Sequence, residues 1–301
     1  MNILCTGGAG FIASHLVDEL IAKDHQVVVI DNLSTGKKEN VNDRAIFYHS
    51  DIRDNLDTIF RDHRFDCVFH FAAQINLRNS IKNPIEDANI NIIGGLNVLE
   101  ACKRHSVKKI IFSSTGGAIY SDEREIPWTE NSKCDPQSPY GISKLTLENY
   151  IKFYNRIYGL DYTILRFSNV FGERQSPLGE AGVVSIFIDN ILKGKPINIF
   201  GSGNQERDFI YVDDVCAAAT HVLDNNISGT FNVSSGIKIS INELLNRLCL
   251  ITPNEVPINY LPEIPGEMFT SCLSNEKLQA TGWSPAFLLD EGLRLTTIYS
   301  R

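Results

Sequence analysis

The chain has 301 residues, of which 43% are hydrophobic and 21% are charged. This composition is typical of a folded globular protein, and the length allows one large α/β domain or two units that share a chain. The net charge is −8 and there is no basic tract, which argues against nucleic acid as a partner. No apolar run approaches the roughly 18 to 20 residues of a membrane-spanning helix, and we expect neither a membrane segment nor a signal peptide.

The seven cysteines are scattered along the chain, and none of them forms a C-x-x-C pair. This odd number and this spacing predict neither a disulfide framework nor a zinc site. We therefore expect a cytoplasmic protein without a bound metal, in which most thiols are buried as small hydrophobic groups.

The N-terminal part of the chain alternates strand and helix patterns. Short apolar or β-branched runs predict strands over 2–6, 26–30, 45–49, 67–71, 109–113 and 162–166. Helical periodicity predicts helices over 11–23, 86–105 and 138–158. Strands that alternate with helices predict right-handed crossovers and a parallel sheet covered by helices on both faces.

The pattern changes after about residue 166. Glycines, prolines and short irregular pieces become more frequent, which indicates a smaller second lobe over 166–301. A strand at 231–233 is expected to return to the main sheet. A segment near 205–235 would then belong with the first domain, 1–165.

A glycine-rich turn joins the first strand to the first helix. Residues 6–13 read TGGAGFIA, which is the spacing G-x-x-G-x-x-A. Glycine lets the backbone approach a pyrophosphate closely, and the helix N-terminus offers free N–H groups. Asp31 ends the second strand, where a carboxylate can accept hydrogen bonds from an adenosine ribose and repel a 2′-phosphate. These features predict a dinucleotide site that prefers NAD to NADP.

Two further pairs of residues can each be interpreted in two ways. Asp51 and Ile52 follow the third strand and could lie at the adenine edge or form a solvated turn. Ser114 and Thr115 directly follow the strand over 109–113, at the sheet edge where parallel α/β proteins bind ligands. Either hydroxyl could bridge a substrate oxygen and a catalytic base.

A tyrosine and a lysine lie four residues apart at the start of the helix predicted over 138–158. This spacing puts Tyr140 and Lys144 on one face of the helix. A neighbouring ammonium group lowers the pKa of a phenol, so Tyr140 is predicted to act as a general base.

These motifs resemble the extended short-chain dehydrogenase/reductase superfamily and, within it, the UDP-glucose 4-epimerase-like group of nucleotide-sugar enzymes. The resemblance covers nearly the whole chain and is carried by segments 6–16, 31–36, 69–74, 112–120, 138–144, 165–175 and 201–215. It implies a Rossmann-type doubly wound parallel sheet with a smaller C-terminal substrate-binding lobe. It also implies a NAD-dependent nucleotide-sugar 4-epimerase that acts on a UDP-hexose through a transient 4-keto sugar, assembled as a homodimer.

The resemblance also implies a role for each motif. The cofactor would be held by Gly7, Gly10, Phe11, Ile12, Asp31, Asn32, Ser34, Asp51, Ile52, Phe71, Ala72, Ala73, Asn91, Ser113, Tyr140 and Lys144. The substrate would be bound by Asn169, Val183, Val184, Phe200, Arg207 and Ser271. The catalytic residues would be Tyr140, Lys144 and one hydroxyl, for which Thr115 is preferred to Ser114.

Three departures from the family pattern bear on the substrate. An extra glycine follows Thr115, which leaves the choice between Thr115 and Ser114 open. Ile264 stands where the family commonly has an arginine that binds a phosphate, so UDP would be held more weakly or the nucleotide sugar would differ. Ser271 is small where relatives have a bulky aromatic, which predicts tolerance of N-acetylhexosamines.

Other functions on the same fold are less favoured. A 4,6-dehydratase or a UDP-glucuronate decarboxylase would need a carboxylate after Thr115, where this chain has two glycines. A sugar reductase is a further alternative. A non-catalytic NAD-binding regulator is disfavoured because Tyr140 and Lys144 are both present.

Overall fold

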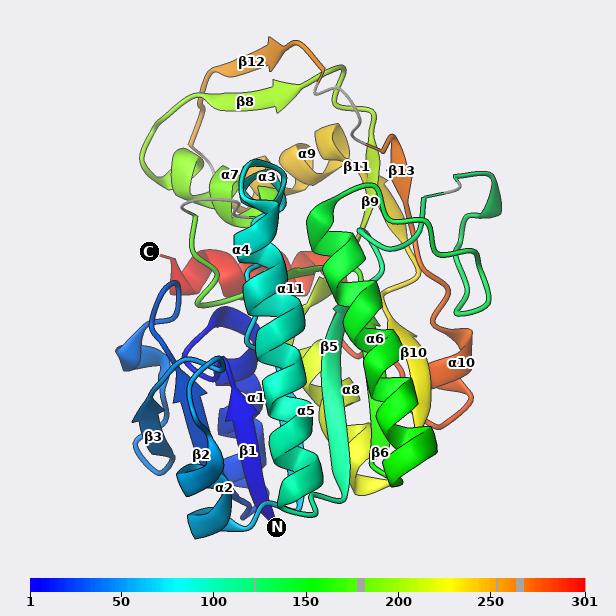
Figure 1. Ribbon diagram of the computed structural model, residues 1–301. Coiled ribbons are helices and arrows are strands. Elements are labelled where there is room, and N and C mark those ends of the chain that lie inside the picture. The colour runs from blue at the N-terminus through cyan, green and yellow to red at the C-terminus, as the bar shows by residue number, and fades with distance from the viewer. Residues whose placement is uncertain (122, 178–181, 253, 264–267, 301) are drawn as a thin grey trace.

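The computed structural model describes residues 1–121, 123–177, 182–252, 254–263 and 268–300 (Figure 1). Its strands are β1 (Asn2–Thr6), β2 (Gln26–Asp31), β3 (Ile46–His49), β4 (Cys67–His70), β5 (Lys109–Thr115), β6 (Asp161–Phe167), β7 (Asn169–Phe171), β8 (Ile197–Phe200), β9 (Glu206–Tyr211), β10 (Gly229–Val233), β11 (Lys238–Ser240), β12 (Ile258–Leu261) and β13 (Thr270–Ser271). Its α-helices are α1 (Phe11–Ala22), α2 (Asp57–His63), α3 (Leu77–Lys82), α4 (Pro84–Ala88), α5 (Gly95–Arg104), α6 (Pro139–Tyr158), α7 (Val183–Leu192), α8 (Val212–Asp224), α9 (Ile241–Ile251), α10 (Glu276–Gln279) and α11 (Leu289–Tyr299).

A seven-stranded sheet forms the centre of the molecule. Its strand order is β10-β6-β5-β4-β1-β2-β3, and every neighbouring pair is parallel. The chain therefore builds outwards from β1 to β3, crosses back to β4 and continues to β10 at the opposite edge. This topology confirms the predicted doubly wound fold, in which the carboxyl ends of all seven strands share one edge.

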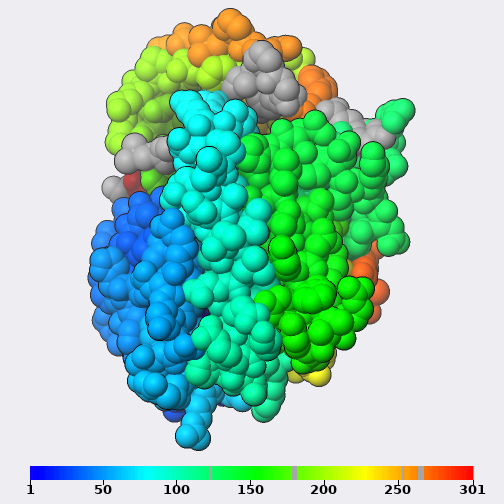
Figure 2. Space-filling view, viewed as in Figure 1, coloured from blue at the N-terminus to red at the C-terminus, as the bar shows by residue number. Residues whose placement is uncertain are grey.

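Helices cover both faces of this sheet because successive side chains of a strand point to opposite faces. In β1, Ile3 and Cys5 belong to the core shared with α1 and α8, whereas Leu4 belongs to the core shared with α2, α5 and α6. Figures 1 and 2 show α5 and α6 side by side over the second face. None of the helices described is both long and apolar enough to cross a membrane.

The helix predicted over 86–105 contains a change of helix type. It begins as α4, continues as the π-helix η2 (Asn89–Gly94) and ends as α5. A π-helix widens the turn and is often found at functional sites. Periodicity alone does not reveal it, because the apolar spacing on either side still fits an ordinary helix.

The residues after β6 build a smaller lobe, which lies at the upper end of Figure 1. In it, β9 pairs with β7, β11 and β13, and β8 pairs with β12. Three elements from this part of the chain lie with the main sheet instead: α8 packs on α1, β10 pairs with β6, and α10 packs beside β10. The boundary at residue 165 stays a prediction.

A buried ion pair joins α6 to the central sheet. Arg166 in β6 donates from Nε and Nη2 to the two carboxylate oxygens of Glu148 in α6, at 2.9 Å and 2.6 Å. The Ser114 hydroxyl at the end of β5 donates to the same carboxylate at 2.6 Å. Both charged groups are buried, so the attraction between them offsets the free energy lost when each leaves water. The pair therefore fixes how α6 lies across β5 and β6.

We expect Arg166→Met to lower the free energy of unfolding by about 3–5 kcal/mol, because the buried Glu148 carboxylate then keeps only the partly exposed Lys152 ammonium, at 3.6 Å, as a cationic partner. The double variant Glu148→Leu/Arg166→Met should regain a large part of this loss, since neither charge of this pair then stays buried. Urea unfolding of the single and double variants measures both values. A double variant that is less stable than the single one would contradict this account of the pair.

Candidate functional site

The loop between β1 and α1 is folded closely against the segment after β4. Gly7 has a φ of +74°, and a Cβ there would lie 2.7 Å from the Ala72 nitrogen, so only glycine fits. The Thr6 hydroxyl accepts hydrogen bonds from the N–H groups of Phe71 and Ala72, each at 3.2 Å. Gly10 is the N-cap residue of α1, and no side chain there accepts a hydrogen bond from the N–H groups of the first turn. A tight cradle at such a helix N-terminus, where Phe11 and Ile12 begin α1, fits a dinucleotide pyrophosphate.

The predicted adenosine residues form one hydrogen-bonded turn at the ends of β2 and β3. Asp31 is buried, and its Oδ2 accepts a hydrogen bond from the Ala9 N–H at 3.0 Å. Asn32 accepts a hydrogen bond from the Ser34 N–H at 3.0 Å and donates to the Asp51 carboxylate at 2.8 Å. The structure thus brings these four predicted residues together with the glycine-rich loop.

Arg53 fixes the Asp51 carboxylate, and sequence reasoning missed it. Its Nε and Nη2 each donate to Asp51 at 2.9 Å, and this bond is the main reason why the pKa of Asp51 falls to about 2. Nη1 of the same guanidinium donates to Glu86 in α4 at 3.0 Å. Ile52, between Asp51 and Arg53, is buried. Asp51 and Arg53 lie two residues apart in a turn and match no known sequence motif. Their contact is therefore visible only in the folded structure.

The other end of the cradle is held by Asn91. This side chain is buried in the π-helix, where it accepts from the Gln74 N–H at 2.8 Å and donates to the Gln74 carbonyl at 2.9 Å. It therefore fixes the turn that follows Phe71, Ala72 and Ala73. In the neighbouring strand, His70 is buried 2.8 Å from the Thr6 hydroxyl, and burial lowers its pKa to about 3.

Helix α6 places Tyr140 and Lys144 at the carboxyl end of β5. Lys144 is only 4% exposed, and its Nζ donates to the Ser113 carbonyl oxygen at 2.8 Å. The same Nζ lies 4.7 Å from the centre of the Phe112 ring and 6.0 Å from the centre of the Tyr140 ring. Thr115 ends this strand. The predicted catalytic residues therefore share one edge of the sheet.

Burial is the main cause of the pKa shifts of Lys144 and Tyr140 in the protein alone. It lowers the pKa of Lys144 to about 8, although the Asp87 and Glu148 carboxylates act in the opposite direction. Burial also raises the pKa of Tyr140, and the Asp87 charge adds to that rise. The predicted fall of the Tyr140 pKa next to the ammonium is thus not seen here, because desolvation and the Asp87 charge both raise this pKa.

The two candidate hydroxyls have different surroundings. The Ser114 hydroxyl is buried and already donates to the Glu148 carboxylate. Thr115 is half-buried at the last position of β5. A hydroxyl whose proton is held by a buried carboxylate is poorly suited to donate to a substrate, so the geometry favours Thr115 over Ser114 as the catalytic hydroxyl.

Three of the predicted substrate residues lie on the small sheet of the second lobe. Asn169 in β7 donates to the Asp208 carbonyl at 3.1 Å. Arg207 in β9 donates to backbone carbonyls, among them that of Met268 at 2.9 Å. Ser271 in β13 is paired with Arg207, and a Cβ at Gly117 would lie 3.8 Å from its hydroxyl. Ser271 therefore lies beside the loop that follows Thr115.

The remaining predicted substrate residues are less suited to direct contact through their side chains. Val184 is 1% exposed in the core, so only its backbone could reach a ligand. Val183 is half-buried at the start of α7, and Phe200 is exposed at the end of β8. Ile264 lies outside the described residues.

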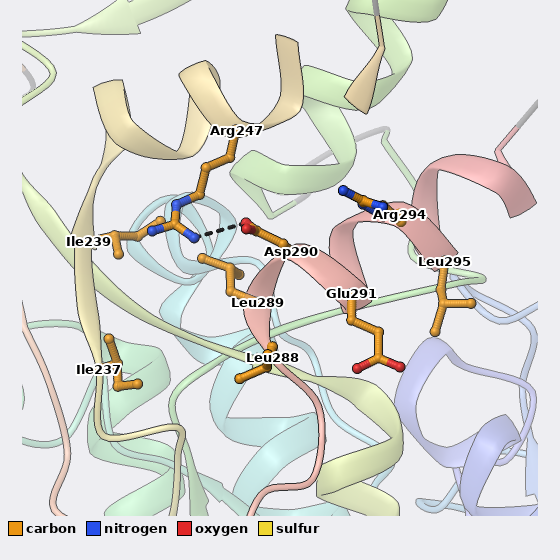
Figure 3. Close-up of a pocket in the computed structure, with 9 residues that line it drawn as sticks. All are labelled: Ile237, Ile239, Arg247, Leu288, Leu289, Asp290, Glu291, Arg294 and Leu295. Atoms are coloured by element: carbon orange, nitrogen blue, oxygen red, sulfur yellow. Dashed lines mark hydrogen bonds and ion pairs between the residues drawn. The ribbon is translucent and has the colours of Figure 1, made fainter. Parts of the chain in front are cut away.

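A surface pocket of about 530 Å³ lies elsewhere, between β11, α9 and α11 (Figure 3). Apolar side chains line it, and Arg247 donates to Asp290 across it at 2.8 Å. None of the predicted site residues contributes to its lining, so it is separate from the site at the carboxyl ends of the strands.

Comparisons with known proteins show similarity to nucleotide-sugar epimerases over nearly the whole chain. A putative UDP-glucose 4-epimerase of Methanocaldococcus jannaschii is 46% identical over 97% of this chain and 96% of its own length. The structure of UDP-glucose 4-epimerase with UDP-glucose from Thermotoga maritima is 46% identical, with a TM-score of 0.97 over 100% of this chain and 99% of that one. UDP-N-acetylglucosamine 4-epimerase from Methanobrevibacter ruminantium M1, in complex with UDP-N-acetylmuramic acid, is 36% identical, with a TM-score of 0.94 over 99% and 97% of the two chains.

The family match extends over most of the chain. Residues 3–234 match the NAD dependent epimerase/dehydratase family, a span that includes the glycine-rich loop, Tyr140 and Lys144. The predicted superfamily and the predicted cofactor, NAD, are thereby confirmed. The chain belongs to the NAD dependent epimerase/dehydratase family.

Proposed function

We propose that the chain catalyses the 4-epimerisation of a UDP-hexose with NAD as its cofactor. The observation that carries this proposal is the placement of Tyr140, Lys144 and Thr115 at the carboxyl end of β5, on the edge of the sheet that also carries the dinucleotide cradle. Epimerases that match this chain over nearly their whole length support the substrate class.

The residues present fit NAD, which supplies a hydride acceptor and donor when it is bound. The cradle at Gly7 and Gly10 would hold its pyrophosphate, and Asp31 would hold the adenosine ribose. Tyr140 and Lys144 would then lie with Asn91 and Ser113 at the nicotinamide end.

The side chains of this protein would carry the proton transfer. Tyr140 would take the proton of the sugar 4-hydroxyl in one direction and return it in the other, so that a 4-keto sugar forms transiently. Thr115 would hydrogen-bond the same sugar oxygen and hold it near the phenol. Lys144, fixed by the Ser113 carbonyl, would place a positive charge where the phenolate forms.

The nucleotide-sugar end of the site would lie in the second lobe. Arg207 and Asn169 would bind the diphosphate, and a guanidinium is well suited to this role. Ser271 is a small, buried side chain next to Gly117, and it would leave more room near the sugar than a bulky aromatic, which supports tolerance of an N-acetyl group.

We also propose that the protein is a cytoplasmic homodimer. Its seven cysteines are all free, which fits a reducing compartment. Ile142, Tyr150, Phe153 and Ile157 are exposed along one face of α6, at the helical spacing of an apolar stripe. Such a stripe on a surface helix indicates an interface, and Figure 2 shows α6 on the open face beside α5.

We expect Tyr140→Phe to retain NAD yet lose about 100-fold or more of its turnover of UDP-glucose, because the phenyl ring fills the same space and cannot accept a proton. NAD is measured after denaturation, and the product by proton NMR at the sugar 4-position. Tyr162→Phe, in the neighbouring strand β6, is the matched control and should behave as the wild-type protein. Full turnover by Tyr140→Phe would remove Tyr140 from the mechanism.

We expect Ser271→Tyr to lower kcat/KM for UDP-N-acetylglucosamine by about 10-fold or more relative to UDP-glucose, because the larger side chain fills the space needed by the acetyl group. Ser271→Ala removes only the hydroxyl and should leave this ratio unchanged. Equal losses for both sugars would show that position 271 does not select between them.

We expect Phe153→Glu to convert a dimer of about twice 33.7 kDa into a monomer, because it places a charge in the middle of the apolar stripe. Sedimentation equilibrium measures the mass. Leu250→Glu makes the same change at an exposed apolar position in α9 and should leave the mass unchanged. A wild-type protein that sediments as a monomer would exclude the homodimer.

A further inference from the structure

A carboxylate buried beneath the catalytic helix has no role in the reaction described above. Asp87 in α4 is 1% exposed. Its Oδ2 accepts a hydrogen bond from the Ser143 hydroxyl at 2.6 Å. Its Oδ1 accepts from Gln74 Nε2 at 2.9 Å and from Asn91 Nδ2 at 3.0 Å. One side chain therefore ties α6 to the π-helix and to the turn after Ala73.

One of these three bonds reaches the first turns of α6, and the other two reach Gln74 and Asn91. Ser143 lies between Tyr140 and Lys144 in the sequence, so its hydroxyl fixes the part of the helix that carries both. A second contact grips the same end of α6, because the Ser80 hydroxyl in α3 accepts a hydrogen bond from the Tyr140 N–H at 3.2 Å. Asn91 and Gln74 connect this grip to the backbone that follows β4. The catalytic helix and the proposed cofactor groove are thus joined through Asp87.

We propose that Asp87 is a positioning residue, which locks the start of α6 to the turn after Ala73 and places a fixed negative charge beneath Tyr140 and Lys144. This inference rests on the proposed epimerase function, in which Tyr140 is the base. The charge opposes ionisation of the phenol and favours the ammonium form of the lysine. Asp87 therefore sets the pH range in which the two groups work together.

The charges around Tyr140 support this account. The groups that face it or its neighbours are Asp87 from α4, Lys144 and Glu148 from α6, and His70 from β4, whereas Arg78 and Lys82 of α3 are exposed. His70 is neutral near pH 7 because burial lowers its pKa to about 3. Glu148 acts on the pKa of Lys144, whereas Asp87 raises the pKa of both Lys144 and Tyr140. Removing the Asp87 charge therefore lowers both pKa values.

The variant Asp87→Asn separates charge from shape. An amide of the same size keeps an acceptor oxygen for Gln74 and Asn91, and the Ser143 hydroxyl can turn to accept from the new NH₂ group. Ser143→Ala does the reverse, because it removes one hydrogen bond and keeps the carboxylate. Asp57→Asn, at a half-buried site in α2 where the carboxylate contacts Arg104 and His105, controls for the loss of one negative charge from the protein.

The experiment records kcat/KM against pH for the NAD-loaded wild type and each variant with UDP-glucose. In the NAD-loaded enzyme, in which the positive charge of the cofactor would favour the phenolate, the acid limb reports ionisation of Tyr140 and the alkaline limb reports loss of the Lys144 charge. In Asp87→Asn both limbs should move to lower pH, by on the order of one pH unit. In Ser143→Ala and Asp57→Asn both limbs should stay in place. A second neutral variant, Asp87→Ser, should show the same shift as Asp87→Asn.

Two outcomes would overturn the proposal. One is a pH profile of folded, NAD-loaded Asp87→Asn that superimposes on that of the wild type. The other is an equal shift in Ser143→Ala, which would assign the effect to shape instead of charge. A wild type that converts no UDP-hexose would refute the proposed function instead. The tyrosinate absorbance that Tyr140→Phe removes then gives the pKa of Tyr140, which should still be lower in Asp87→Asn than in the wild type.

Discussion

The site depends on how α6 is held across the carboxyl end of β5. This helix carries three buried polar side chains that bond to other elements: Ser143 to α4, Lys144 to β5, and Glu148 to both β5 and β6. Burying a charge costs several kcal/mol unless it is paired and hydrogen-bonded. A shift or rotation of α6 would break these partnerships together. The position of Tyr140 therefore follows from the burial of its neighbours, and the phenol itself needs no strong bond to hold it.

Helix α4 connects the two ends of the proposed cofactor site through adjacent carboxylates. Glu86 points outwards and binds Arg53, which clamps Asp51 at the adenosine end. Asp87 points inwards and binds Ser143 at the catalytic end. Consecutive residues of a helix point about 100° apart, so five residues of α4 suffice to reach both neighbours. The π-helix that follows widens the turn in which Asn91 meets Gln74, which gives the local change of helix type a structural use.

The sequence allows prediction of the features that depend on spacing. Alternating apolar runs predicted the parallel sheet, and the glycine spacing and the pair Tyr140 and Lys144 pointed to a NAD-binding family that the comparisons confirm. The partners of Asp87, Arg53 and Ser114 could not be predicted, because each contacts a residue whose neighbourhood is created only by folding. Ser114 shows this most clearly. Its residue type and position suit catalysis as well as those of Thr115 do, and only the buried Glu148 distinguishes the two.

The proton chemistry follows from a competition between burial and charge. In the chain by itself, burial disfavours both the phenolate of Tyr140 and the ammonium of Lys144. A base that ionises readily on its own would exchange protons with water before a sugar is bound. The Asp87 charge raises the pKa of Tyr140, which disfavours the phenolate. It also raises the pKa of Lys144, which favours the charged ammonium. Ionisation of Tyr140 then requires further positive charge in the site, and this ties proton removal to a fully assembled site.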